Sequence, residues 1–69
     1  MTIQDRIDTF HSAIECENVN ASLIALLRLS EEMGSNILIY TEDGNEGVSL
    51  YNGEFGFTIE SNDHIRLIP

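Results

Sequence analysis

The first residues of the chain have the apolar spacing of an amphipathic helix. Thr2 is suited to be its N-cap, and Asp5, three residues later, completes a variant of the capping box. Large apolar residues then recur at the i, i+4, i+7 and i+11 positions that share one stripe of a helix. The sequence therefore predicts an N-terminal helix that buries the stripe formed by Ile3, Ile7, Phe10 and Ile14.

A second amphipathic helix is predicted between Asn20 and Gly34. Asn20 is the expected N-cap, which would set Val19 against Ile24 as a hydrophobic staple. Gly34 is expected to end the helix in the left-handed conformation. The apolar face of this helix is expected to consist of Leu23, Ile24, Leu26, Leu27 and Met33.

From residue 36 onward the pattern changes from helical to extended. A short apolar run rich in β-forming residues comes first, and the later segments alternate between apolar and polar residues. Polar turns that contain Gly or Asn separate these segments. Strands are therefore predicted over residues 37–40, 48–51, 54–60 and 64–68.

The Asn52-Gly53 step predicts a tight hairpin between the second and third strands. Apolar residues that face each other across such a hairpin share one side of a half-buried sheet. A two-residue type I′ turn at this step would pair Tyr51 with Glu54, Leu50 with Phe55 and Val48 with Phe57.

These elements predict an α+β fold in which two N-terminal helices pack on one face of a four-stranded antiparallel meander, in the order ααββββ. The 69 residues fit one small domain, residues 1–69, and the hydrophobic content of 42% argues against disorder. In the last strand, Ile65 and Leu67 are expected to point inward. The core is expected to contain Ile7, Phe10, Ile14, Leu23, Leu26, Leu27, Ile39, Leu50, Phe55, Phe57, Ile59 and Leu67.

The charge of the chain narrows the classes of partner. Twelve acidic residues stand against three basic ones, all of them arginines, and the formal net charge is -9. A surface of this sign repels nucleic acid and anionic membranes, and it attracts basic protein surfaces. Direct nucleic-acid binding is therefore not expected, and Phe55 and Phe57 are interpreted as core residues rather than as base-stacking aromatics.

The sequence offers no pattern for catalysis or for a cofactor. His11 and His64 have no nucleophile in a motif context, and Cys16 has no adjacent cation that would favour a thiolate. The acidic loop at residues 42–47 has oxygen ligands without the spacing of a calcium-binding loop, so we expect a solvated turn. We therefore expect no enzymatic activity, no cofactor and no metal site.

The chain is expected to act in the cytoplasm, which would be the host cytoplasm if a phage encodes it. Its first residues lack the basic start and the apolar run of a signal peptide. No apolar stretch approaches the ~18 residues of a membrane span. A single cysteine, Cys16, fits a reducing compartment.

The acidic residues are the main candidates for a binding site. Asp8 and Glu15 are expected to lie on the acidic side of the first helix, about 10 Å apart along its axis at ~1.5 Å per residue. Acids in the last turn of the second helix oppose its dipole, which suggests a role other than helix stability. Tyr51 is expected on the outer face of the sheet, either as an interface anchor or in cross-strand packing. The predicted protein-binding residues are Asp5, Asp8, Glu15, Glu31, Glu32, Tyr51 and Glu54.

In size and charge balance the chain resembles the small acidic inhibitors that phages use against nucleic-acid-handling defence systems, including anti-CRISPR and anti-restriction proteins. The resemblance is one of composition and covers no motif. It implies a non-enzymatic nucleic-acid mimic that binds a basic site on a bacterial DNA- or RNA-binding protein. The alternative is a small structural or assembly protein that self-associates through its sheet, as a homo-oligomer, and is acidic for solubility. A mimic is expected to gather its acids on one face, whereas a solubility surface spreads them.

Overall fold

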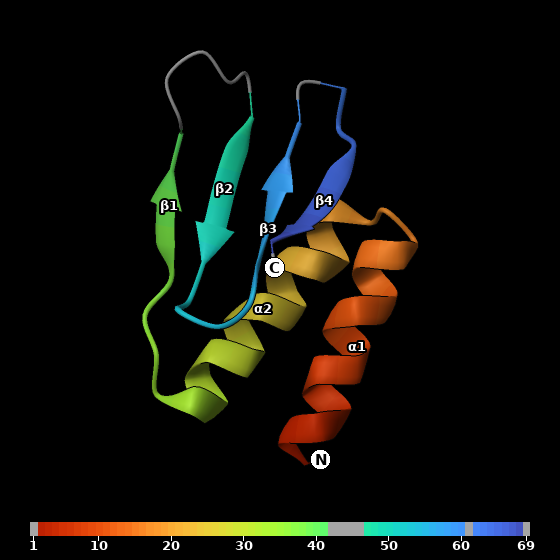
Figure 1. Ribbon diagram of the computed structural model, residues 1–69. Helices are drawn as coiled ribbons and strands as arrows, with labels where there is room; N and C mark the ends of the chain where they lie inside the picture. Colours follow the sequence, from red (N-terminus) through yellow and green to blue (C-terminus); the bar gives the residue numbers. More distant parts are fainter. Residues whose placement is uncertain (1, 42–46, 61, 69) are drawn as a thin grey trace.

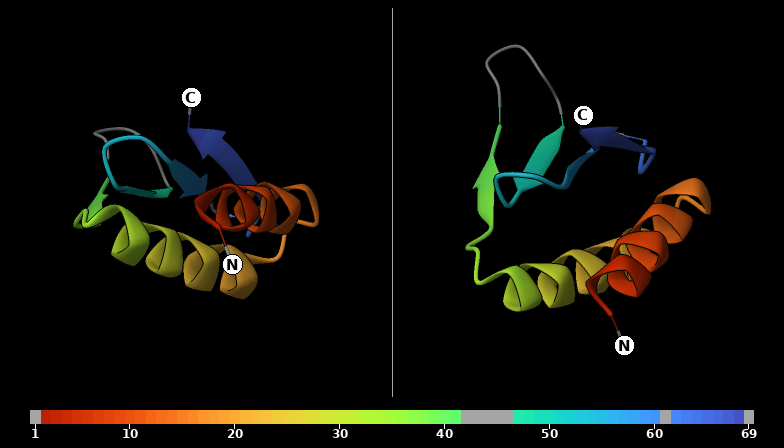
Figure 2. Two further views of the ribbon diagram at one scale, coloured as in Figure 1. Left: turned by 90° about the horizontal axis from the view of Figure 1, so that it is seen from below. Right: turned by 60° about the horizontal axis from the view of Figure 1, so that its bottom comes forward.

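The computed structural model describes residues 2–41, 47–60 and 62–68. The strands form one antiparallel sheet in the order β1-β2-β3-β4, and both helices cover the same face of it (Figures 1 and 2). The predicted ααββββ fold is therefore confirmed. Its elements are α1 (Ile3–Glu15), α2 (Val19–Met33), β1 (Leu38–Tyr40), β2 (Val48–Tyr51), β3 (Gly56–Ile59) and β4 (Ile65–Ile68).

The start of α1 agrees with the prediction. The Thr2 hydroxyl accepts a hydrogen bond from the Asp5 backbone N–H at 3.2 Å, and the Asp5 carboxylate accepts one from the Thr2 backbone N–H at 3.1 Å. Both halves of the capping box are thus present. Of the predicted apolar stripe, Phe10 is fully buried and Ile14 packs against the core, whereas Ile3 at the helix start is exposed.

The predicted start of α2 is wrong by two residues. The N-cap is Asn18, whose side-chain oxygen accepts a hydrogen bond from the Ala21 backbone N–H at 3.0 Å. Val19 is consequently the first helical residue and packs against the core, so the staple with Ile24 does not form. Either asparagine can cap a helix, and the earlier one is used because it adds Val19 to the buried side. The predicted C-cap is confirmed, since Gly34 has φ 68°.

The buried face of α2 is also rotated from the prediction. Leu26 is buried as expected, but Leu27 is 47% exposed and Ile24 is 51% exposed. Small side chains occupy the positions next to Leu26, and they allow α2 to approach its neighbours closely. The buried residues of α2 are Ser22, Ala25, Leu26, Leu29 and Ser30.

The β2–β3 hairpin has a longer loop than predicted. Tyr51 pairs with Gly56 rather than with Glu54, and the loop covers residues 52–55. The Asn52 backbone N–H donates to the Phe55 carbonyl at 2.9 Å, and the Asn52 side-chain oxygen accepts from the Glu54 and Phe55 N–H groups at 3.0 and 2.8 Å. A type I′ turn needs a positive φ at both of its central residues. Gly53 has φ 100°, but the φ of Asn52 is not positive, so the predicted type I′ turn is wrong.

The corrected register differs from the prediction by two residues, which leaves every side chain on its predicted face. Leu50 now pairs with Phe57, and Val48 pairs with Ile59. The loop is fixed to α2 because the Asn52 side-chain N–H donates to the Ser30 hydroxyl at 2.9 Å. This contact joins residues far apart in the sequence, and local turn preferences do not reveal it.

The core lies between the two helices and the middle of the sheet. Phe57 on β3 is fully buried. Its row of cross-strand partners runs outward to Ile39 on β1 and to Leu67 on β4, which are 69% and 42% exposed. These two residues and Leu27 were predicted to be buried. The helices do not extend far enough to cover the two strand residues, and Leu27 lies on the exposed side of α2. The buried cluster contains Phe10, Ala25, Leu26, Leu50, Phe57 and Ile65.

Candidate functional site

The outward side of α1 carries three of the predicted acids. Asp5, Asp8 and Glu15 are all exposed, and helical geometry places them on the side of α1 opposite Phe10. The Asp8 carboxylate accepts a hydrogen bond from the Gln4 side chain at 3.0 Å, while the Asp5 carboxylate belongs to the capping box. Asp8 and Glu15 are therefore free of a role in the helix cap.

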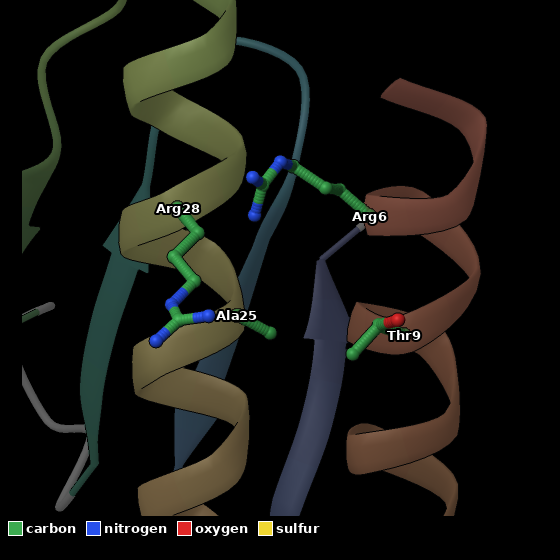
Figure 3. Close-up of a pocket in the computed structure, with 4 residues that line it drawn as sticks. All are labelled: Arg6, Thr9, Ala25 and Arg28. Carbon is green, nitrogen blue, oxygen red and sulfur yellow. The ribbon is translucent and has the colours of Figure 1, made fainter. Parts of the chain in front are cut away.

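The two predicted acids at the end of α2 have different surroundings. Glu32 lies 3.4 Å from the Nε of Arg6 across the helix pair, so its charge is partly balanced. Glu31 is exposed. Arg6 and Arg28 also line a shallow pocket of about 70 Å³ between α1 and α2, together with Thr9 and Ala25 (Figure 3).

The two remaining candidates come from the β2–β3 hairpin. Glu54 is exposed in the loop. Tyr51 is only half-buried and lies against its own sheet: its hydroxyl donates to the Gly53 carbonyl at 2.9 Å. A Cβ at Gly56 would lie 2.7 Å from Tyr51 Cδ1, so the glycine leaves space for the ring. The Tyr51 ring thus takes part in cross-strand packing, one of the two roles expected for it.

The candidate acids do not gather on a single face. The Asn52 side chain contacts Ser30 and Met33, which places the loop with Glu54 at the C-terminal end of α2, near Glu31 and Glu32. At the opposite end of the molecule, other acids contact basic side chains. Glu17 contacts His64, and Glu60 lies 3.2 Å from Arg66. Among the described residues the predicted acids therefore form two groups, one on the outward side of α1 and one around the C-terminal end of α2, rather than the single face expected of a mimic.

The groups considered for chemistry have separate surroundings. His11 lies beside Phe10 and Phe55, with ring centroids 5.9 and 6.4 Å away, whereas His64 contacts Glu17. Cys16 is exposed at the end of α1. No group of three His, Cys, Asp or Glu residues converges within residues 2–41, 47–60 and 62–68. The acidic loop considered for calcium lies outside the described residues except for Gly47.

The sequence prediction missed the exposure of the first strand. Leu38 is 62% exposed and Tyr40 is 40% exposed, and with Ile39 they make up the whole of β1. Apolar side chains at consecutive strand positions point to opposite faces, so a core on one face cannot bury all three. That pattern, in the first strand of a meander, is the signal that would have indicated an exposed apolar edge.

Comparisons of the chain with protein-family models, with curated proteins and with solved structures find no match. Neither of the two described helices is long and apolar enough to cross a membrane.

Proposed function

We propose that this chain is a non-enzymatic, acidic protein-binding module that uses α1 to engage a basic surface on a nucleic-acid-binding protein. The observation that carries the proposal is the outward side of α1, where Asp5, Asp8 and Glu15 are exposed together. The rise of ~1.5 Å per residue separates Asp8 and Glu15 by about 10 Å along the axis. Carboxylates at such spacing on a rigid helix can occupy a groove that is built for phosphates.

The distribution of positive charge supports this choice of face. Arg6 is turned toward α2, where it meets Glu32, and Arg66 meets Glu60 on the sheet. Arg28 lies on α2 beside the small interhelical pocket. The outward side of α1 therefore keeps its negative charge, and the net charge of -9 adds a long-range attraction for a basic partner.

The specific form of the proposal is an inhibitor of the phage anti-defence type. It would act in the cytoplasm by occupying the basic site of a bacterial DNA- or RNA-binding protein. Its composition supports this form, since it resembles that of small acidic phage inhibitors.

The test is binding to bacterial proteins that are enriched on a heparin column, because such proteins carry basic, nucleic-acid-binding surfaces. The immobilised chain should capture one of them at low salt and release it to an added DNA duplex or RNA strand. Capture should weaken as salt rises, because exposed charges are screened over about 8 Å at physiological ionic strength. Capture that survives high salt and ignores competing nucleic acid would contradict the proposal.

A double charge reversal locates the surface. Asp8→Lys with Glu15→Lys should slow association strongly, and it leaves the capping box of Asp5 intact. Glu31→Lys with Glu54→Lys is the comparison variant, because it makes the same change in net charge in the other group of predicted acids, at the C-terminal end of α2. Equal losses in the two variants would show that net charge alone drives binding and that α1 is not the site.

A further inference from the structure

Two of the three arginines of the chain line one pocket. Arg6 on α1 and Arg28 on α2 flank the space between the two helices, and its walls are completed by Thr9 and Ala25 (Figure 3). The third arginine, Arg66, lies on β4. The chain contains no lysine, so this pocket holds most of its permanent positive side-chain charge.

The Nε–H group of Arg6 is buried without a hydrogen-bond partner among the described residues. The Arg6 side chain is only 21% exposed, and Glu32 lies 3.4 Å from this nitrogen. The contact with Glu32 offsets charge, but its geometry is not that of a hydrogen bond. A buried donor without a partner is unfavourable, and a guanidinium carries five N–H donors. Arg6 therefore has donor capacity that a bound acceptor can use.

Arg28 is likewise available to a ligand. It is exposed, and it forms no ion pair within the part of the chain that the structure describes. Glu31 and Glu32 follow it by three and four residues, the spacing at which ion pairs form along a helix. The Arg28 side chain instead runs toward Ala25, in the opposite direction along α2 (Figure 3). Its guanidinium thus lies at the pocket rather than at the acids of its own helix.

The pocket walls between the two arginines are apolar. The Thr9 hydroxyl donates to the Asp5 carbonyl at 2.9 Å and its oxygen is turned away from α2, so Thr9 presents its methyl group to the pocket, as Ala25 does (Figure 3). Charges attract one another more strongly beside apolar groups than in open water. A water molecule needs roughly 10–15 Å³ of such a cavity, and the pocket has a volume of about 70 Å³. The space therefore suits one small ion.

These features match a phosphate group. Guanidinium groups bind phosphate through paired, charge-assisted N–H···O hydrogen bonds. A phosphate monoester carries a charge between about −1.5 and −2 near pH 7, so it suits two arginines better than a singly charged carboxylate does. We infer that Arg6 and Arg28 bind a phosphate group between α1 and α2, either as the free ion or as a monoester whose remainder extends into solvent. The inference goes beyond the proposed function, because the outward acids of α1 are not part of the pocket.

Inorganic phosphate is the probe that tests the site. The three arginines give three side-chain Nε–Hε signals in a proton–nitrogen correlation spectrum of the full chain. When phosphate replaces chloride, the signals of Arg6 and Arg28 should shift along a saturating curve, while the signal of Arg66 should not. Constant ionic strength keeps the screening of the net charge of -9, which opposes any anion, unchanged. Equal shifts of all three signals, or a linear response without saturation, would overturn the inference.

The chemistry of the anion is tested with acetate and with glycerol phosphate. Acetate is planar and singly charged, so it should shift the Arg6 and Arg28 signals only at much higher concentration than phosphate. Equal affinities for acetate and phosphate would overturn the assignment to a phosphate group. Glycerol phosphate should shift the same two signals as inorganic phosphate. Tighter binding of the ester would support a phosphate carried on a larger molecule, and tighter binding of inorganic phosphate would support the free ion.

Substitution of single arginines locates the ligand. Arg28→Gln changes an exposed side chain, so the fold should be retained. Phosphate affinity should fall about tenfold or more, because hydrogen bonds from a charged group are lost. Arg66→Gln is the matched control: it makes the same change in net charge on the sheet, beside Glu60, and should leave the affinity within about twofold. Similar losses in the two variants would show that net charge alone governs the response, and they would overturn the site.

Discussion

The two edge strands of the sheet differ in what holds them to the rest of the molecule. β4 buries Ile65 in the core cluster, packs against α1 and carries the Arg66–Glu60 ion pair. β1 buries none of its side chains, and among the described residues it pairs with β2 alone. One edge is thus fixed by side-chain packing, whereas the other depends on its backbone hydrogen bonds.

This difference shows how a small helical layer divides a sheet into stable and less stable parts. The helices cover the centre of the sheet and the side of β4, and they leave the β1 side open (Figure 2). Local stability follows buried apolar contacts, so the amides of β1 should exchange faster than those of β4 in the monomer.

A truncation at the centre of the sheet gives the loss of stability against which the losses at both edges are compared. Phe57→Ala should lower the free energy of unfolding by ~3–5 kcal/mol, because this fully buried ring is in contact with the cluster that joins sheet and helices. Urea unfolding followed by far-ultraviolet circular dichroism measures the loss. A cooperatively folded variant of near-normal stability would contradict the central place of Phe57.

Ile65→Ala tests the anchored edge. The expected loss is about 2–3 kcal/mol, at the low end of the range for buried isoleucine, because a site on an edge strand can partly collapse around the missing atoms. The same urea experiment measures it. A loss of only a few tenths of a kcal/mol would show that the side-chain anchor of β4 contributes little.

Asn52→Ala tests how firmly the β2–β3 loop, which lies between the two edge strands, is attached to α2. Removing the amide leaves the Ser30 hydroxyl and the loop N–H groups without this partner, and the expected loss is ~1–3 kcal/mol. Ser30→Ala and the double variant complete a mutant cycle that isolates the Asn52–Ser30 hydrogen bond. Strictly additive losses would mean that the two side chains do not interact.

Ile39→Ala should have the smallest effect. An exposed side chain on an unanchored strand contributes little to the monomer, so the expected change lies within about 0.5 kcal/mol. The same urea experiment measures it. A loss as large as that of Ile65→Ala would remove the distinction between the two edges.

The sequence predicted those parts of the fold that local chemistry decides. The Thr2 capping box, the left-handed Gly34 and the faces of the strands depend on neighbouring residues or on a fixed period. The start of α2 was missed because two asparagines compete for the cap, and the choice depends on whether Val19 reaches the core. The loop length was missed because Asn52 is held by Ser30, a residue on another element.

The sequence indicated which residue types form the candidate site, but it did not indicate where all of them lie relative to one another. The α1 acids followed from helical spacing, whereas the positions of Glu32 beside Arg6 and of Glu54 near the end of α2 depend on tertiary packing. The exposure of Ile39 was not predicted, because an apolar residue in a strand is expected to be covered. Its exposure follows from the limited extent of the helical layer, which the sequence does not reveal.

The order of strands in the sheet also bears on how the chain folds as it is synthesised. Each strand pairs with its neighbour in the sequence, so every hairpin can form soon after its residues leave the ribosome. The contact between α1 and β4, by contrast, joins the first and last elements of the chain. Phe10 cannot complete its packing until Ile65 has been added. The first helix to be made is thus among the last to be fully enclosed.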